Sequence, residues 1–240
     1  MNLIRRTAAI VLVGAFALSA CGGSDDPVVA IPETDDSTGT SSSTVLDPNR
    51  PDATVASELP DGFEGLIGPL EVIGDVLPPL ETDDFTADPA VGTAAPVLVG
   101  LDYDGETVRI DATVSGPTMV VFLAHWCPHC NAEIPVLNQL RDDNRIPDGV
   151  NVVAVSTAIR PGQPNFPPDE WLDDTNWTFP VIADGVDMEL QTFIGADAFG
   201  VTGFPFTTLI DADGNVAARW SGGRNPNEIA SLLASLPNVA

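Results

Sequence analysis

The chain has 240 residues, with nine Arg, no Lys and 35 Asp plus Glu, which gives a formal net charge of −26. This charge repels phosphate backbones and anionic headgroups, so it argues against nucleic-acid binding and against electrostatic docking on a membrane. Three Cys are too few for a disulfide-stapled mini-protein. The length suits one domain of ordinary size with additional segments.

Residues 1–20 have the features of a signal peptide. Two Arg precede an apolar run, Ala8 to Leu18, which is too short to span a bilayer as a helix. The run leads into Leu18-Ser19-Ala20-Cys21, which resembles the lipobox of bacterial lipoprotein signal peptides. The resemblance implies that Cys21 is lipidated and starts the mature chain. A plain secretory signal with an incidental Cys is the alternative.

Residues 21–90 comprise this Cys and an acidic, Pro-, Ser- and Thr-rich stretch. From residue 22 to residue 90 there are 16 acidic residues and nine Pro, against the single basic residue Arg50. Such a composition buries too little apolar surface to offset its ordering entropy, and it predicts an extended tether. Four apolar residues at helical spacing leave open whether a short part packs on the domain: Phe63, Leu66, Ile67 and Leu70.

Residues 91–240 are predicted to fold as one α/β domain, because strand patterns alternate with helical ones before a terminal hairpin and helix. The first half predicts a hairpin over 97–110 with its turn at Asp104-Gly105, a buried strand over 118–124, a helix over 133–141 and a strand over 150–155. The second half predicts a helix over 168–174, a strand over 179–183, a helix over 188–193, a hairpin over 207–220 and a closing helix over 227–236. Asn225 is the expected N-cap of the closing helix.

The most informative stretch is Trp126-Cys127-Pro128-His129-Cys130, at the junction of a predicted buried strand and a helix. Free N–H groups and the dipole at a helix start favour a negative sulfur, so Cys127 is the candidate nucleophile. Cys130 lies one turn further on and is placed to resolve a mixed disulfide. A static structural disulfide is the alternative.

These residues resemble the thioredoxin superfamily, specifically its membrane-anchored, extracytoplasmic branch typified by TlpA and ResA. Trp126 precedes the Cys pair as in that family, Pro135 stands where the family has a helix-kinking Pro, and residues 201–211 resemble the segment with the family's cis-proline. The resemblance implies a thioredoxin-like fold over residues 91–240. This fold has a central mixed sheet flanked by helices, here with an N-terminal β-hairpin extension, and it requires no bound cofactor.

The resemblance also assigns roles to individual residues. Pro205 corresponds to the cis-proline that faces the disulfide, and the backbone of Phe204 would pair with an extended substrate. Trp126 would shape the same groove. Glu133 matches an acidic residue near the buried thiol and would carry its proton, because the buried Asp of ordinary thioredoxins is replaced here by Val121. An ordinary surface carboxylate and an ordinary trans proline are the alternatives for Glu133 and Pro205.

The sequence gives conflicting indications of whether the protein oxidises or reduces its substrates. Pro128-His129 is the dipeptide of the strong oxidant DsbA, and a His in the loop can stabilise the thiolate, which makes the disulfide more oxidising. We therefore expect an oxidant. The branch resemblance implies the alternative, a reductant for cytochrome c maturation. A peroxidase site with Thr or Ser three residues before the Cys is not expected, because residue 124 is Ala.

A hypothesis from a different class is metal delivery. The two His of the chain, His125 and His129, flank Cys127 and Cys130, and two thiolates with two imidazoles can hold Cu(I) or Zn²⁺. A copper-carrying lipoprotein is thus the third interpretation.

The sequence as a whole predicts a lipid-anchored thiol–disulfide oxidoreductase on the outer face of the bacterial cytoplasmic membrane. Its expected partners are cysteine-containing exported proteins or apocytochrome, and a membrane redox protein that recycles the disulfide. Nucleic acid is not expected as a partner.

Overall fold

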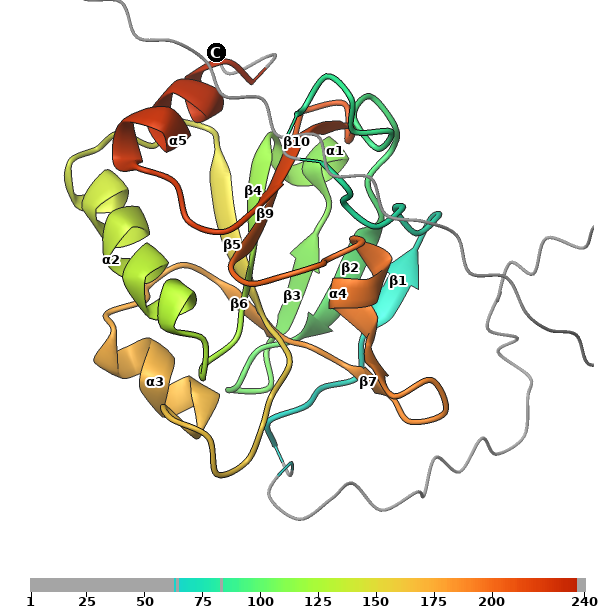
Figure 1. Cartoon of the computed structure of the whole chain (residues 1–240), viewed down its shortest axis with the longest axis vertical. Coiled ribbons are helices and arrows are strands. Elements are labelled where there is room, and N and C mark those ends of the chain that lie inside the picture. The colour runs from blue at the N-terminus through green and yellow to red at the C-terminus, as the bar shows by residue number, and fades with distance from the viewer. Residues whose placement is uncertain (1–62, 64, 83, 237–240) are drawn as a thin grey trace, which may run out of the picture. The chain divides into compact units, whose positions relative to one another are not determined.

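The computed structural model describes residues 63, 65–82 and 84–236 (Figure 1). Its centre is a five-stranded mixed sheet with the strand order β10-β9-β4-β5-β6. Strands β4, β5 and β6 are parallel to one another, β9 is antiparallel to β4, and β10 is antiparallel to β9. The strand bounds are β4 Thr118–Leu123, β5 Asn151–Ser156, β6 Val181–Ala183, β9 Phe206–Ile210 and β10 Val216–Ser221.

The central strand β4 serves two apolar cores, because all six of its residues are buried and successive side chains point to opposite faces. Met119, Val121 and Leu123 belong to one core, whereas Val120 and Phe122 belong to the other. This explains why the sequence shows an unbroken apolar run there rather than an alternating pattern.

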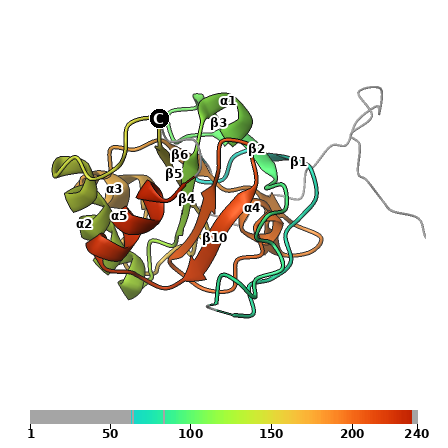
Figure 2. The same ribbon diagram turned by 90° about the horizontal axis from the view of Figure 1, so that it is seen from above.

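Three helices cover the first face of the sheet: α2 (Pro128–Asp142), α3 (Pro168–Asp174) and α5 (Pro226–Ala234). Figures 1 and 2 show them together on one side of β4 and β5. They bury Leu137, Trp171 and Leu233 against the sheet. Helix α5 begins as predicted, since the Asn225 side chain accepts hydrogen bonds from the backbone N–H groups of Asn227 and Glu228.

The opposite face is covered by a second, three-stranded sheet with the order β1-β2-β3 and by two short helices. The strands are β1 Glu71–Ile73, β2 Val97–Leu101 and β3 Thr107–Ile110, and the helices are α1 Ala112–Ser115 and α4 Ile194–Ala198. The predicted hairpin is formed by β2 and β3, and Gly105 in its turn has a φ of +85°. The N-terminal extension of the fold therefore contains this hairpin and one further strand.

The segment over residues 65–90 packs on the domain, which answers the question that the sequence left open. Strand β1 pairs with β2, and Leu77 and Leu80 are buried in the second core. The carboxylate of Asp88 accepts hydrogen bonds of 2.9 and 2.6 Å from the guanidinium of Arg219, in a pair whose side chains are fully buried. An extended tether is therefore wrong for this segment, because its apolar residues reach a sheet edge and the second core, and one of its acidic residues, Asp88, pairs with a buried Arg. Cys21 and the signal peptide lie outside the described residues.

The helix predicted over residues 188–193 is wrong. Strands β7 (Val186–Asp187) and β8 (Thr192–Phe193) form a short hairpin there, and α4 starts only at Ile194. The Asp187 carboxylate accepts hydrogen bonds of 2.9 Å from the N–H groups of Glu189 and Leu190, which closes a turn instead of a helix.

The remaining predicted strands and helices are present within a few residues of their expected bounds, and the central mixed sheet flanked by helices confirms the thioredoxin-like fold. Among the described residues, no helix combines the length and the apolar character that crossing a bilayer requires.

Candidate active site

Cys127 lies at the turn between β4 and α2 and is the N-cap residue of that helix. Its thiol, 6% exposed, donates a hydrogen bond of 3.4 Å to the backbone carbonyl of Phe204. Neither Cys127 nor Cys130 is in a disulfide, so the structure shows the dithiol form. The structure thus places the predicted nucleophile at a helix start, next to the loop that precedes β9.

Cys130 is fully buried on the first turn of α2. The backbone N–H of Ala124 donates to its sulfur at 3.5 Å. Burial raises the pKa of the Cys130 thiol far above its usual range, and the charges of Cys127 and Glu133 raise it further. Cys130 therefore holds its proton at neutral pH and needs a nearby base before it can act as a nucleophile.

Glu133 is such a base by position, since it follows Cys130 by three residues on α2 and is only 3% exposed. Burial raises the pKa of its carboxyl to about 7, against the opposing effects of the Arg224 backbone amide and the Arg224 charge. Its Oε1 atom is buried without a hydrogen-bond partner within the described chain. A carboxyl group that titrates near neutrality beside a buried thiol has the properties of a proton acceptor.

Phe204 and Pro205 form the wall opposite Cys127. The peptide bond between them is cis, as the family resemblance implied. The Phe204 ring meets the Trp126 ring edge to face, with centroids 6.2 Å apart, and the Trp126 Nε1–H donates a 2.7 Å hydrogen bond to the carbonyl of Ala158. Phe204 thus contacts the thiol of Cys127, Trp126 packs on the Phe204 ring and Pro205 follows directly, and a substrate groove is predicted at these three residues.

Pro128 and His129 are both exposed on the first turn of α2. The imidazole of His129 is therefore accessible to solvent and to a docked substrate, next to the helix start that carries Cys127. This position is compatible with the redox-tuning role that the sequence predicts for the dipeptide.

His125 has a structural role that the sequence did not reveal. Its Nε2 accepts a hydrogen bond of 3.1 Å from the backbone N–H of Arg160, so its Nδ1 carries the proton and donates at 2.8 Å to the carbonyl of Pro164. Burial lowers the pKa of this imidazole, which keeps it neutral. Since backbone groups occupy both ring nitrogens, His125 is not free to bind a metal, and the metal-delivery interpretation loses one of its four ligands.

Further contacts connect the loop over residues 158–167 to the active-site turn. The Arg160 guanidinium lies 4.1 Å from the centroid of the Trp126 ring. The Asn165 amide donates a 2.8 Å hydrogen bond to the carbonyl of His125, and the Trp171 indole donates one of 2.8 Å to the side chain of Asn131. These partners are separated by 34 to 40 residues along the chain, so no local sequence pattern predicts the contacts.

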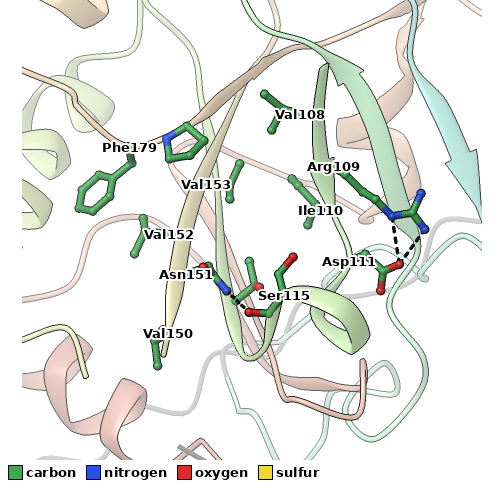
Figure 3. Close-up of a pocket in the computed structure, with 12 residues that line it drawn as sticks. Val108, Arg109, Ile110, Asp111, Ser115, Val150, Asn151, Val152, Val153 and Phe179 are labelled. Atoms are coloured by element: carbon green, nitrogen blue, oxygen red, sulfur yellow. Dashed lines mark hydrogen bonds and ion pairs between the residues drawn. The ribbon is translucent and has the colours of Figure 1, made fainter. Parts of the chain in front are cut away.

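A cavity of about 400 Å³ between β3 and β5 lies away from this chemistry. Thr118 and Asn151, which line it, begin β4 and β5, whereas the Cys pair follows the end of β4. Figure 3 shows two pairings among its polar groups, Arg109 with Asp111 and the Asn151 amide with the carbonyl of Ser115. The cavity is therefore separate from the redox site.

Comparison with known proteins identifies the family of the chain. The model of the AhpC/TSA family matches residues 91–219. The thiol-disulfide oxidoreductase ResA of Geobacillus thermodenitrificans is 29% identical over 147 residues, which cover 61% of this chain and 78% of the relative. The thiol:disulfide interchange protein DsbE of Escherichia coli is 32% identical over 136 residues, covering 54% and 63%.

Among solved structures, a thiol:disulfide interchange protein of the thioredoxin family from Chlorobium tepidum is 26% identical. Its match covers 60% of this chain and 95% of that chain, with a TM-score of 0.48. The chain, with its dithiol at the start of α2, belongs to the AhpC/TSA family and is a thioredoxin-fold thiol–disulfide oxidoreductase.

Proposed function

We propose that the protein exchanges disulfides with exported proteins through Cys127 and Cys130. The observation that carries this proposal is the arrangement of the two sulfurs. Cys127 at the helix start contacts the carbonyl of Phe204 on the substrate side, while Cys130 lies buried one turn behind it. One sulfur can thus meet a partner, and the other can only reach the first.

In the reducing direction, the Cys127 thiolate attacks one sulfur of a substrate disulfide and forms a mixed disulfide. The other substrate sulfur leaves with the electron pair and takes up a proton. Cys130 then gives its proton to Glu133 and attacks the sulfur of Cys127. The substrate leaves as a dithiol, and the protein is left with a Cys127–Cys130 disulfide. The oxidising direction consists of the same steps reversed.

An extended substrate strand would bind along the backbone of Phe204, whose carbonyl already faces the reacting sulfur. The rings of Trp126 and Phe204, which pack edge to face on each other, offer an apolar surface beside that strand. This mode uses main-chain hydrogen bonds, so it fits many unfolded exported chains that share little sequence.

We assign the oxidising direction to this protein on the basis of Pro128-His129. The exposed His129 at the start of α2 supports the assignment, because a donor or cation beside the helix start stabilises the thiolate and thus the reduced form. The alternative is a reductant for cytochrome c maturation, which follows from the resemblance to the TlpA/ResA branch. A reduction potential above about −150 mV supports the oxidant and one below about −250 mV the reductant.

The Leu18-Ser19-Ala20-Cys21 sequence supports a lipid anchor that holds the protein at the outer face of the bacterial cytoplasmic membrane. A membrane redox protein then has to return the Cys pair to its starting state after each turnover, since the exchange itself only moves the disulfide.

The three Cys of the chain provide matched variants for a test. Cys127→Ser abolishes exchange with a model disulfide substrate, whereas Cys130→Ser accumulates the mixed disulfide, which non-reducing gel electrophoresis detects. Cys21→Ser keeps exchange at the wild-type rate and leaves the membrane fraction. Undiminished exchange by Cys127→Ser would refute the mechanism, and membrane retention of Cys21→Ser would refute the anchor alone.

A further inference from the structure

Arg224 lies in the loop between β10 and α5, and its guanidinium packs against two neighbouring aromatic rings. Its Cζ atom is 5.0 Å from the centroid of the Phe85 ring and 5.2 Å from that of the Trp220 ring. The two rings themselves are 6.2 Å apart at an interplanar angle of 52°. Together they form a clamp in which one ring comes from the N-terminal segment and the other from β10.

The same loop lies against the catalytic carboxyl. A Cβ atom added at Gly223 would lie 2.7 Å from Oε2 of Glu133, so the backbone of this loop runs close to the carboxyl group. Arg224 follows directly, and its amide and its charge both favour the ionised form of Glu133 against burial. None of the three ion pairs of the described chain includes Arg224, so its charge is not neutralised by another carboxylate in contact.

The other ionisable groups around this pair are few. The thiols of Cys127 and Cys130 belong to the same helix start as Glu133, and Glu133 acts on the Cys130 thiol. On α5, the exposed Glu228 lines a surface hollow together with Phe85 and Arg224. Glu228 is exposed to solvent there. Arg224 is the cation whose charge lowers the pKa of the buried Glu133 carboxyl.

We propose that Arg224, held by Phe85 and Trp220, is a positioning residue that sets the ionisation of Glu133 and so the transfer of the Cys130 proton. The inference rests on the proposed function of Glu133 as proton acceptor. It makes the N-terminal segment part of the active site's electrostatics, because Phe85 holds the cation in place. The segment then does more than connect the domain to the preceding chain.

The test is the titration of the Glu133 carboxyl in the full-length dithiol protein, followed by ¹³C NMR and assigned by the resonance lost in Glu133→Gln. Arg224→Gln removes the cation, so the pKa of Glu133 rises by about one pH unit. Exchange at pH 7 then falls about fivefold and recovers at higher pH, as the smaller carboxylate fraction dictates. Phe85→Leu keeps the charge but releases the clamp, and it shifts the titration in the same direction by a smaller amount.

Arg141→Gln is the matched control, because Arg141 also lies over an aromatic ring, 5.7 Å from the centroid of Phe179, at the far end of α2. It is expected to leave the Glu133 titration unchanged even where it lowers thermal stability. An unshifted titration in folded Arg224→Gln and in Phe85→Leu would overturn the inference. Absence of exchange by the wild-type protein would instead overturn the proposed function, and the titration remains measurable in that case.

Discussion

Glu133 combines three properties at the scale of one residue: burial, a buried oxygen without a partner, and a position one turn from a thiol that must lose a proton. Burial of a carboxylate is costly for stability, since the charged form loses its hydration. The raised pKa of Glu133 thus corresponds to a loss of folding stability at pH values where the carboxyl group is ionised.

This cost predicts a pH-dependent gain of stability in Glu133→Gln. The folded-state pKa of about 7 lies above the unfolded value, so the folded wild-type protein binds more protons between the two values. Its stability from this group is highest at low pH and falls as the pH rises towards 7. Glu133→Gln lacks the penalty, so its free energy of unfolding at pH 8 should exceed that of the wild type by roughly 1–3 kcal/mol. The variant should then unfold at a higher denaturant concentration.

Urea denaturation at pH 5 and pH 8 measures this effect, with Glu228→Gln on the exposed face of α5 as the control. A difference between variant and wild type that is the same at both pH values would contradict the raised pKa.

Short sequence motifs predict some residues of the site but not others. Cys127, Cys130 and Pro205 were predictable because each belongs to a short motif whose geometry is set by its neighbours in the chain. His125 and Arg224 were not, because their roles depend on Pro164, 39 residues away, and on Phe85, far earlier in the chain. The sequence suggests metal binding for His125 only because this residue is adjacent to the Cys pair.

At the scale of elements, the N-terminal segment is held by the pair of Asp88 and Arg219. Arg219 also donates hydrogen bonds of 2.8 and 3.0 Å to the carbonyls of Pro78 and Phe199, so one guanidinium joins this segment, α4 and β10. Burial alone would raise the pKa of Asp88, but the hydrogen bonds and charge of Arg219 hold it below its usual range. The carboxylate is therefore charged at all ordinary pH values.

Asp88→Asn should lower the free energy of unfolding by about 3–5 kcal/mol, because it leaves a buried guanidinium without its counter-charge. The stabilisation depends on a lowered pKa, so it is present above the unfolded value near 3.9 and is lost as the pH falls through the folded value. Asp142→Asn, in the exposed pair with Arg141, is the control and should cost less than about 1 kcal/mol. Equal losses in thermal or denaturant unfolding would contradict a special role for Asp88.

Helix α4 is an element whose position local sequence patterns do not predict. Helix α4 starts where Asp184, ten residues earlier and fully buried, accepts hydrogen bonds from the N–H groups of Gly195 and Ala196. A helix of five residues has little intrinsic stability, so this distant cap and its packing decide its position. By contrast, β4 and α5 were predictable, because a six-residue apolar run and an Asn-Pro helix start are local signals.

At the scale of the whole molecule, the second core depends on residues that precede the family match. Leu77, Leu80 and Ala90 belong to that core, and the family model begins only at residue 91. The described domain is therefore larger than the part that the family model matches.

A chain that starts at residue 91 should consequently fold less stably than one that starts at residue 63. It exposes the core surface that Leu77 and Leu80 cover, and it removes the two partners that the segment gives to the guanidinium of Arg219, the Asp88 carboxylate and the Pro78 carbonyl. Comparing the denaturation midpoints of the two chains measures the effect. Equal midpoints would show that the segment contributes nothing to the stability of the domain.

The order in which the N-terminal segment joins the domain has a mechanical consequence. Tension applied ahead of residue 65 first loads the three-residue pairing of β1, then Leu77 and Leu80, then Phe85, and only last the ion pair at Asp88. A pull strong enough to peel the segment as far as Phe85 opens the clamp on Arg224 while the main sheet is still intact. If Arg224 sets the ionisation of Glu133 as we propose, such partial detachment would raise the pKa of Glu133 before the domain unfolds.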